Sequence, residues 1–391
     1  MTSKPKILLV FGTRPEAIKM APVFVALKNR PDLFDVKICV TGQHRQMLDQ
    51  VLSLFEMKAD YDLNIMTSGQ DCTDITSKVL ISLREVLTIE KPSRILVHGD
   101  TTTTLAASLA AFYAKIPVAH VEAGLRTGNY FAPWPEEMNR HVTTVLADLH
   151  FAPTETAKKN LIKENISPSQ IFVTGNTVID ALYSVVAKTT HPGPLKTALE
   201  QTFSFIQKNK KLILVTGHRR ENFGEGFNNF CNAILTVLKE NPDSQVCYPV
   251  HLNPNVREPV DRILKNAGKE LSSRIHLIDP LEYVPFVYLM NRSYFILTDS
   301  GGVQEEGPAL GKPVLVSRDI TERPEALLGN SVKLVGTDPN KIVLESNLLL
   351  RNELEYSRRS KVVSPYGDGH AAERILKVLS AEAITHAIQA A

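Results

Sequence analysis

The chain has 391 residues, of which 43% are hydrophobic, and its formal net charge at pH 7 is +2. This length favours two domains, each able to bury a core of its own. Because Lys and Arg are spread along the chain, the charge pattern argues against a nucleic-acid-binding protein, while a few local cations suffice for a small anionic ligand.

Short apolar runs alternate with longer amphipathic segments in the first half of the chain. The run at 6–13 leads into Pro15, which suits the first turn of a helix. Similar runs recur further along, at 35–42, 94–100, 118–124, 149–153 and 171–176. Short continuous apolar runs are typical of strands buried on both faces, and their alternation with helices predicts parallel βαβ units.

The Pro- and Gly-containing segment 191–194 follows a helical stretch and indicates a joint between domains. The strand pattern then restarts, at 211–218, 244–251, 274–279, 294–300, 312–317 and 332–337, and the tail from Ala371 is helical in pattern. We therefore predict an α/β fold of two doubly wound, Rossmann-like domains, 1–185 and 205–370, that face each other across a cleft.

Polar residues gather at the carboxyl ends of the predicted strands, where open parallel sheets bind their ligands. They are Arg14, Gln43, His44, Asp100, Glu122, Asn176, His218, His251, Ser300 and Arg318. Ordinary loops are polar as well, but charged groups recur at the strand ends of both predicted sheets. We expect these two edges to form one site.

The stretch DSGGVQEEG at 299–307 follows a predicted strand and opens a helix. Gly301 and Gly302 allow an anion to approach the backbone beside Ser300, and a helix N-terminus offers free N–H donors. Glu306, about a turn further on, is placed to accept hydrogen bonds from ribose hydroxyls. The alternative is an ordinary glycine-rich turn. If the stretch does bind a ligand, we predict a phosphate or diphosphate.

Cationic residues follow two further strands. Arg14 offers a planar fork for phosphate oxygens, and Lys19 lies on the helix after it, although a surface pair of Arg14 with Glu16 is the alternative. His218, Arg219 and Arg220 follow the first strand of the second half, although a single cluster of this kind is often only solvated charge. Together with the glycine pair, these positions indicate one anionic ligand with two phosphates.

Carboxylates occur near the same edges. Asp100 precedes a Thr-rich helix start, Glu122 ends a strand, and Glu136, Glu137 and Arg140 stand between prolines and a helix. Asp100 as a helix N-cap and Glu136 as a helix-start charge are the simpler readings. Several carboxylates beside a diphosphate site nevertheless suggest acid–base chemistry on a neutral group such as a sugar.

Several other classes of protein are disfavoured. His and carboxylate residues lack the spacing of a metal site, no GxxxxGK[ST] motif occurs, and the G-x-G-x-x-A match within 366–372 does not follow a first strand. The four cysteines form no CxxC pair and are typical of a reduced, cytoplasmic protein. No signal peptide or membrane span is expected.

A dozen ordered motifs resemble those of the bacterial non-hydrolysing UDP-N-acetylglucosamine 2-epimerases. They run from about residue 6 to residue 376 and include GTRPEAIKMAP, TGQHRQMLDQ, HGDTTTT, HVEAGLRTG, PWPEEMNR, TGNTVIDAL, TGHRRENFGEG, HLNPNVREP, TDSGGVQEE, GKPVLV, ERPEA and SPYGDG. The resemblance implies a GT-B fold whose C-terminal helix, 371–391, packs back on the first domain, and a homodimer.

The resemblance also implies roles for particular residues. The UDP-binding positions resemble Arg14, Lys19, His218, Phe286, Ser300, Gly301, Gly302, Glu306 and Arg323, and those near the sugar resemble Asp100, Glu122, Glu136, Arg140 and His218. A second UDP-N-acetylglucosamine often binds in this family as an activator, near positions that resemble Gln43, Gln46 and His251. The loop Ser68-Gly69-Gln70 lacks an arginine that some members have there, and Leu281, Gly307, Ala309 and Ser364 depart from the family pattern without touching a proposed catalytic carboxylate.

The chemistry of such a substrate narrows the mechanism. The C2 proton of a UDP-hexosamine is not acidic, so C3 must be oxidised by a nicotinamide or UDP must be eliminated from C1. The sequence shows no convincing nicotinamide site, and we predict no cofactor. The resemblance implies elimination to a 2-acetamidoglucal and re-addition of UDP, with UDP-N-acetylmannosamine feeding surface polysaccharides. A hydrolysing epimerase, a GT-B glycosyltransferase and a non-catalytic nucleotide-sugar sensor remain alternatives.

Overall fold

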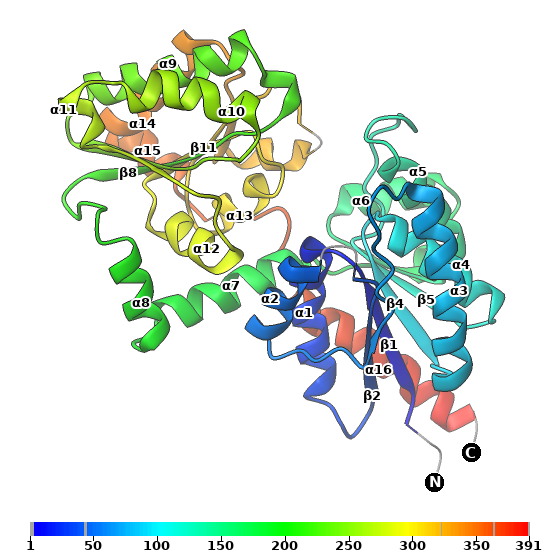
Figure 1. Cartoon of the computed structure of the whole chain (residues 1–391). Helices are drawn as coiled ribbons and strands as arrows, with labels where there is room; N and C mark the ends of the chain where they lie inside the picture. The colour runs from blue at the N-terminus through cyan, green and yellow to red at the C-terminus, as the bar shows by residue number, and fades with distance from the viewer. Residues whose placement is uncertain (1–3, 43–44, 322, 363, 390–391) are drawn as a thin grey trace. The chain divides into compact units, whose positions relative to one another are not determined.

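A computed structural model describes residues 4–42, 45–321, 323–362 and 364–389 (Figure 1). The chain packs as two compact units: Met1–Ala181 with Tyr366–Ala391 forms unit 1, and Leu182–Pro365 forms unit 2. The division lies inside helix α7 (Thr177–Thr190), whose first turns are buried in unit 1. The joint expected at 191–194 is therefore misplaced, because that Pro/Gly segment makes the turn between α7 and α8 (Pro194–Thr202).

Unit 1 contains a seven-stranded sheet with the order β3-β2-β1-β4-β5-β6-β7, in which each recorded strand pair is parallel. The strands are β1 (Lys6–Phe11), β2 (Asp35–Val40), β3 (Tyr61–Asp62), β4 (Arg94–His98), β5 (Val118–Val121), β6 (Leu149–Ala152) and β7 (Ile171–Val173). Six of them match the predicted runs. The edge strand β3 was not predicted, since two residues carry no readable pattern.

Helices pack against both the sheet and each other in unit 1. They are α1 (Arg14–Lys28), α2 (Arg45–Leu54), α3 (Cys72–Glu90), α4 (Thr102–Tyr113), α5 (Glu136–Leu146), α6 (Glu155–Lys163) and α16 (Ala371–Gln389), with a 3₁₀ turn at Pro168–Gln170. The last helix, α16, lies against α1 (Figure 1). Helix α1 begins where a capping box formed by Thr13 and Glu16 satisfies backbone N–H groups, with Pro15 in the first turn.

Unit 2 contains a six-stranded parallel sheet with the order β10-β9-β8-β11-β12-β13. The strands are β8 (Lys211–Thr216), β9 (Ser244–Pro249), β10 (Ile275–Ile278), β11 (Phe295–Thr298), β12 (Val314–Val316) and β13 (Val332–Leu334). Besides the end of α7 and the whole of α8, the helices of unit 2 are α9 (Glu225–Glu240), α10 (Pro254–Pro259), α11 (Lys269–Ser272), α12 (Tyr283–Arg292), α13 (Val303–Ala309), α14 (Pro339–Arg351) and α15 (Glu353–Arg359), with 3₁₀ turns at Arg220–Asn222 and Pro324–Gly329 and a π-helical turn at Val260–Lys265.

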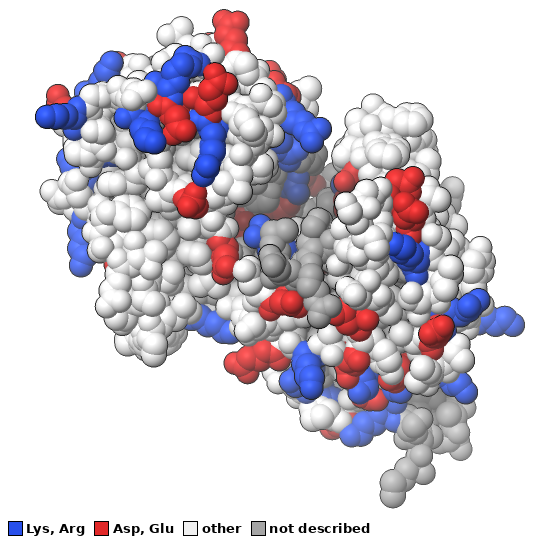
Figure 2. Space-filling view, in the orientation of Figure 1, with Lys and Arg blue, Asp and Glu red and all other residues white. Residues whose placement is uncertain are grey.

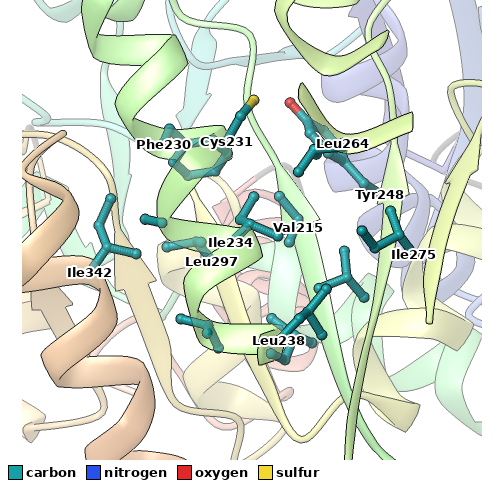
Figure 3. Packing of buried hydrophobic residues seen from close by; sticks show 14 of the residues in the cluster. Val215, Phe230, Cys231, Ile234, Leu238, Tyr248, Leu264, Ile275, Leu297 and Ile342 are labelled. Carbon is teal, nitrogen blue, oxygen red and sulfur yellow. The ribbon is translucent and has the colours of Figure 1, made fainter. Parts of the chain in front are cut away.

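The core of unit 2 joins the sheet to the helices that cover it (Figure 3). Phe230 and Ile234 of α9 pack with Val215 of β8, Leu297 of β11 and Ile342 of α14, and all five are at most 2% exposed. This continuous apolar contact, worth about 25 cal/mol per Å² removed from water, fixes the strand ends that carry the polar residues.

Both sheets confirm the predicted α/β class with two doubly wound units. The strand order reverses between β1 and β4 in unit 1 and between β8 and β11 in unit 2. Such switch points are where doubly wound sheets bind ligands.

In the described residues, no helix is long and apolar enough to cross a membrane. Acidic and basic side chains are interspersed over the face shown in Figure 2.

Candidate functional site

Asp100 and Arg140 meet at the switch point of unit 1. Asp100 follows β4 closely, and Arg140 on α5 donates from Nε (2.9 Å) and Nη2 (2.6 Å) to its Oδ2. Asn139 Nδ2 donates to the backbone oxygen of Asp100 at 2.8 Å. Burial on its own lowers the pKa of Arg140, but the neighbouring Asp100 and Glu137 carboxylates raise it above its ordinary value. The aspartate is therefore held firmly against α5.

Glu137 is a fully buried carboxylate, and its position in the sequence predicted no individual role for it. It accepts hydrogen bonds from Arg140 Nη1 (2.8 Å), Thr127 N (2.9 Å) and Gly128 N (3.0 Å). Burial raises the pKa of its carboxyl, but the bonds from Arg140 and the two backbone groups outweigh burial and leave the pKa below the ordinary value. Glu137 thus ties the segment before α5 to the arginine that holds Asp100.

Glu136, one residue earlier, is in a different environment. Neighbouring positions on a helix point about 100° apart, so Glu136 does not share these contacts. Its Oε2 is buried and has no hydrogen-bond partner within the described ranges. Burying a carboxylate oxygen without a hydrogen bond costs free energy, unless a ligand or solvent group donates a hydrogen bond to it. Glu136 therefore suits a role toward a bound molecule.

Glu122 lies at the end of β5 with a left-handed backbone, φ 63°. It forms an ion pair with Lys19 of α1, accepts a hydrogen bond from Asn176 Nδ2 at 2.7 Å, and lies 3.8 Å from Nε2 of His98. Burial lowers the pKa of His98 to about 4, so this imidazole is neutral near pH 7. Non-glycine residues in the left-handed region carry backbone strain and cluster at functional sites.

Arg14 starts α1 at the carboxyl end of β1 and is half-buried. The alternative of a surface pair with Glu16 does not hold, because Glu16 is only 2% exposed. Its carboxylate accepts hydrogen bonds from Gly12 N (3.1 Å), Thr13 N (2.7 Å) and Thr101 Oγ1 (2.7 Å). Burial raises the pKa of Glu16 despite these bonds.

Unit 2 brings together residues that follow three strands. His218 comes after β8 and His251 after β9, and their rings stack with centroids 5.4 Å apart and planes 18° from parallel. Asp299, after β11, is fully buried and accepts hydrogen bonds from the backbone N–H groups of His218 and Arg219. In the sequence, Asp299 is the first residue of the DSGGVQEEG stretch and shows no further sign of this contact.

The glycine pair lies next to Asp299 and leads into α13. Ser300 N donates to Thr298 Oγ1 at 2.9 Å, and a side chain added at Gly302 would meet nothing closer than Glu306 Oε2, at 3.8 Å. Glu306 accepts a hydrogen bond from Tyr283 Oη at 3.0 Å. Burial, helped by Glu306, raises the pKa of Tyr283 well above its ordinary value, which keeps the hydroxyl protonated as a donor.

The remaining predicted residues lie in varied settings. Phe286 on α12 is half-buried, and Arg323 donates from Nε to Glu305 Oε1 at 2.5 Å. Gln43 lies outside the described residues, as does the side chain of Gln46, so of the three positions expected near a second ligand only His251 is placed. Within the described part of the chain, no group of His, Cys, Asp and Glu is arranged to hold a metal ion.

Comparisons with known proteins agree with these observations. Residues 25–380 match the protein family described as UDP-N-acetylglucosamine 2-epimerase. The UDP-N-acetylglucosamine 2-epimerase of Escherichia coli K12 is 58% identical over 374 residues, which cover 96% of this chain and 98% of that protein. The Yersinia pestis protein of the same name is 57% identical over 97% of this chain and its own full length.

Solved structures give the same result. The UDP-GlcNAc 2-epimerase of Neisseria meningitidis, bound to UDP-GlcNAc, superposes with a TM-score of 0.87 at 53% identity, covering 96% of this chain and 99% of that one. The Methanocaldococcus jannaschii enzyme in complex with UDP-GlcNAc and UDP has a TM-score of 0.76 at 33% identity, with coverage of 96% and 99%. The GT-B-like type of fold that the motifs implied is thereby confirmed.

Proposed function

Because this chain belongs to the UDP-N-acetylglucosamine 2-epimerase family, we propose that it interconverts UDP-N-acetylglucosamine and UDP-N-acetylmannosamine without releasing free sugar. The observation that carries the proposal is the group of three carboxylates in unit 1. Asp100 is held by Arg140, Glu122 is held by Lys19 and Asn176, and Glu136 has an unpartnered buried oxygen. Three differently held carboxylates suit proton transfer to and from the two faces of a sugar carbon.

The proposed reaction proceeds by elimination and re-addition. A base removes the C2 proton while the bond between C1 and the diphosphate oxygen breaks, and UDP leaves with that electron pair. The product is a 2-acetamidoglucal, with a double bond between C1 and C2. A proton then adds to the opposite face of C2, and UDP attacks C1 again. This route needs acids, bases and cations at the site, and it requires no change of oxidation state.

The carboxylates take the proton-transfer roles in this scheme. Asp100, Glu122 and Glu136 exchange protons with C2 and with the groups around it. Arg140 keeps one oxygen of Asp100 in place through two hydrogen bonds. Such fixed geometry lowers the entropic cost of reaching the transition state.

The leaving diphosphate needs positive charge and N–H donors. We assign this role to Arg14, Lys19 and His218, together with the backbone at Ser300–Gly302. Glu306 would accept hydrogen bonds from ribose, and Phe286 and Arg323 would contact the nucleotide. The UDP-GlcNAc and UDP bound by relatives support a nucleotide-sugar ligand for these residues.

Further parts of the proposal concern the setting of the enzyme. We propose that it acts in the cytoplasm as a homodimer and supplies UDP-N-acetylmannosamine for surface polysaccharide.

His251, with Gln43 and Gln46, would bind a second UDP-N-acetylglucosamine as an activator. A hyperbolic dependence of the forward rate on substrate, together with a reverse reaction that needs no added UDP-N-acetylglucosamine, would contradict this activation.

The proposed function is tested by proton NMR of the purified protein with UDP-N-acetylglucosamine in D₂O. Formation of UDP-N-acetylmannosamine with deuterium at C2 supports non-hydrolysing epimerisation. Free N-acetylmannosamine with UDP would assign the chain to the hydrolysing class instead. If neither forms, the glycosyltransferase and sensor alternatives are separated by adding candidate acceptor sugars.

A further inference from the structure

A buried carboxylate and a partly exposed imidazole lie together at the switch point of unit 2. Strands β8 and β11 are paired with Thr216 opposite Thr298, so the residues that follow them meet at the sheet edge. Asp299 is 0% exposed, whereas the side chain of His218 is 43% exposed. The pair therefore reaches from the protein interior to the surface where a ligand would bind.

The two oxygens of Asp299 have different surroundings. Oδ2 accepts the backbone N–H groups of His218 and Arg219, each at 2.8 Å. Oδ1 is buried, has no hydrogen-bond partner among the residues that the structure describes, and lies 3.5 Å from Nδ1 of His218. That separation is slightly long for a hydrogen bond, and catalytic hydrogen bonds commonly tighten when substrate binds.

His251 restrains the same imidazole from another strand. Its ring stacks on that of His218, 5.4 Å away between centroids. The backbone N–H of His218 is already fixed by Asp299. With its main chain and one ring face both restrained, His218 presents a narrow range of orientations.

The charged groups around His218 set its protonation. Burial lowers its pKa most; Asp299 raises it, His251 and Arg219 lower it, and Glu221 raises it, and the net effect leaves the pKa below its ordinary value. Because this pKa is lowered, the His218 ring is neutral at pH 7 in the free protein. A neutral imidazole carries a single proton, either on Nδ1 or on Nε2. Which nitrogen holds that proton decides what the ring offers to a ligand.

We propose that Asp299 is the positioning residue of His218, and that it keeps the single proton on Nδ1. Nε2 can then take up a second proton from solvent and donate a hydrogen bond to a diphosphate. The role toward a diphosphate rests on the proposed function. The tautomer itself is a property of the free protein. With UDP bound, the imidazolium would be held between Asp299 and a phosphate oxygen, in the manner of a carboxylate that orients a catalytic histidine.

The substitution Asp299→Asn gives a specific test. The two backbone N–H groups still require an oxygen acceptor, so the amide oxygen takes the place of Oδ2 and the NH₂ group faces Nδ1. An NH₂ donor requires a free lone pair on Nδ1, and the single proton must then move to Nε2. The variant should keep its fold while it inverts the tautomer.

Long-range ¹H–¹⁵N NMR of histidine-labelled protein near pH 7.5 identifies the ring nitrogen of His218 that carries the proton. The His218 signals are assigned as those that disappear in His218→Gln. We expect Nδ1–H in the wild type and Nε2–H in Asp299→Asn. The matched control Asp279→Asn alters a carboxylate that is 85% exposed and should leave the His218 signals unchanged. A wild-type Nε2–H tautomer, measurable without any Asp299 variant, overturns the proposal, as does Nδ1–H in Asp299→Asn.

Kinetics give a second readout. Asp299→Asn should lower kcat by about 100-fold and change KM for UDP-N-acetylglucosamine by less than about threefold. An unchanged kcat in a variant with the inverted tautomer would show that Asp299 does not position a functional group. If the wild type itself forms no epimer, the proposed function fails, while the NMR result still decides the tautomer.

Discussion

Both contacts that Arg140 makes with Asp100 go to a single oxygen, Oδ2, from Nε at 2.9 Å and from Nη2 at 2.6 Å. The arginine therefore fixes the direction of the carboxyl group while Oδ1 stays outside the clamp. A carboxylate held through one oxygen can exchange a proton at the other without losing its orientation.

Replacing Asp100 with Asn should lower deuterium exchange at C2 by at least about 100-fold, because the amide cannot take up the proton. UDP affinity should stay within about threefold, since the residue is assigned to the sugar and not to the nucleotide. The two quantities are measured by NMR in D₂O and by calorimetry with UDP. The control Asp32→Asn, which alters an exposed partner of Arg30, should exchange normally. Wild-type exchange in Asp100→Asn would remove this residue from the mechanism.

Glu137 should contribute to both stability and its pH dependence. Glu137→Ala removes the acceptor of three hydrogen bonds and leaves Arg140 without one buried partner, a change that costs about 3 kcal/mol of unfolding free energy. Its lowered pKa means that the wild-type contribution is complete above the ordinary glutamate value and is lost as the pH falls through the lower, folded-state value. Urea unfolding from pH 7 to pH 3 should therefore show a smaller acid loss in Glu137→Gln than in the wild type. Parallel curves would contradict this account.

Three buried histidines on neighbouring strands should make unit 1 sensitive to mild acid. Burial lowers the pKa of His98 to about 4, of His120 to about 3 and of His150 to about 4. The unfolded chain takes up protons below about pH 6.5 that the folded unit does not, so stability is full above that pH and falls toward pH 4. Each histidine adds a slope of about 1 kcal/mol per pH unit. His150→Leu should reduce the slope measured by urea unfolding between pH 7 and pH 5, whereas the exposed His191→Gln should leave it unchanged.

Gly124, two residues beyond Glu122, tests how tightly this strand end is packed. Its φ is +88°, and an added Cβ would lie 2.4 Å from the backbone oxygen of Ala157. Gly124→Ala should cost about 3 kcal/mol, because both the conformation and the space are unsuitable. Gly69→Ala shares the positive φ, +77°, but meets nothing within 4 Å, and should cost only about 1 kcal/mol. Equal losses in thermal unfolding would show that the backbone conformation alone matters at Gly124.

The hydroxyl of Tyr283 should matter for nucleotide binding through Glu306. Tyr283→Phe removes the hydrogen bond that orients this carboxylate, and we expect UDP affinity to fall about fivefold, which corresponds to roughly 1 kcal/mol. Tyr356→Phe is the matched control, because its hydroxyl donates to the backbone oxygen of Tyr294 in the same unit. A loss of affinity in the control alone would contradict the role given to Tyr283.

Much of the fold could be predicted because buried parallel strands leave a strong local pattern. Twelve apolar runs became strands, whereas Tyr61–Asp62 is too short to show any periodicity. The strand order was not readable, since it depends on contacts between segments far apart in the sequence. The apolar runs predicted the polar strand ends, and motif resemblance indicated the family.

The partners of those strand-end residues were harder to predict. Glu136 and Glu137 are identical in type and adjacent, and only the turn of α5 shows that one is buried in a hydrogen-bond network while the other has an unpartnered oxygen. In the sequence, Asp299 is simply part of a glycine-rich turn. Only the pairing of β8 with β11 shows that it lies beside His218. Local sequence patterns do not indicate contacts between residues that are far apart in the chain.

The route of the chain through its two units has a consequence for biosynthesis. Unit 2 is one continuous stretch, Leu182–Pro365, and can pack as soon as that stretch has left the ribosome. Unit 1 lacks α16 and the hydrogen bonds from Ala371 N and Ala372 N to Asp180 until the segment after Pro365 is made. The half of the molecule that is synthesised first is therefore the half that is finished last, and a nascent chain stalled before Tyr366 would expose the face of α1 that α16 covers.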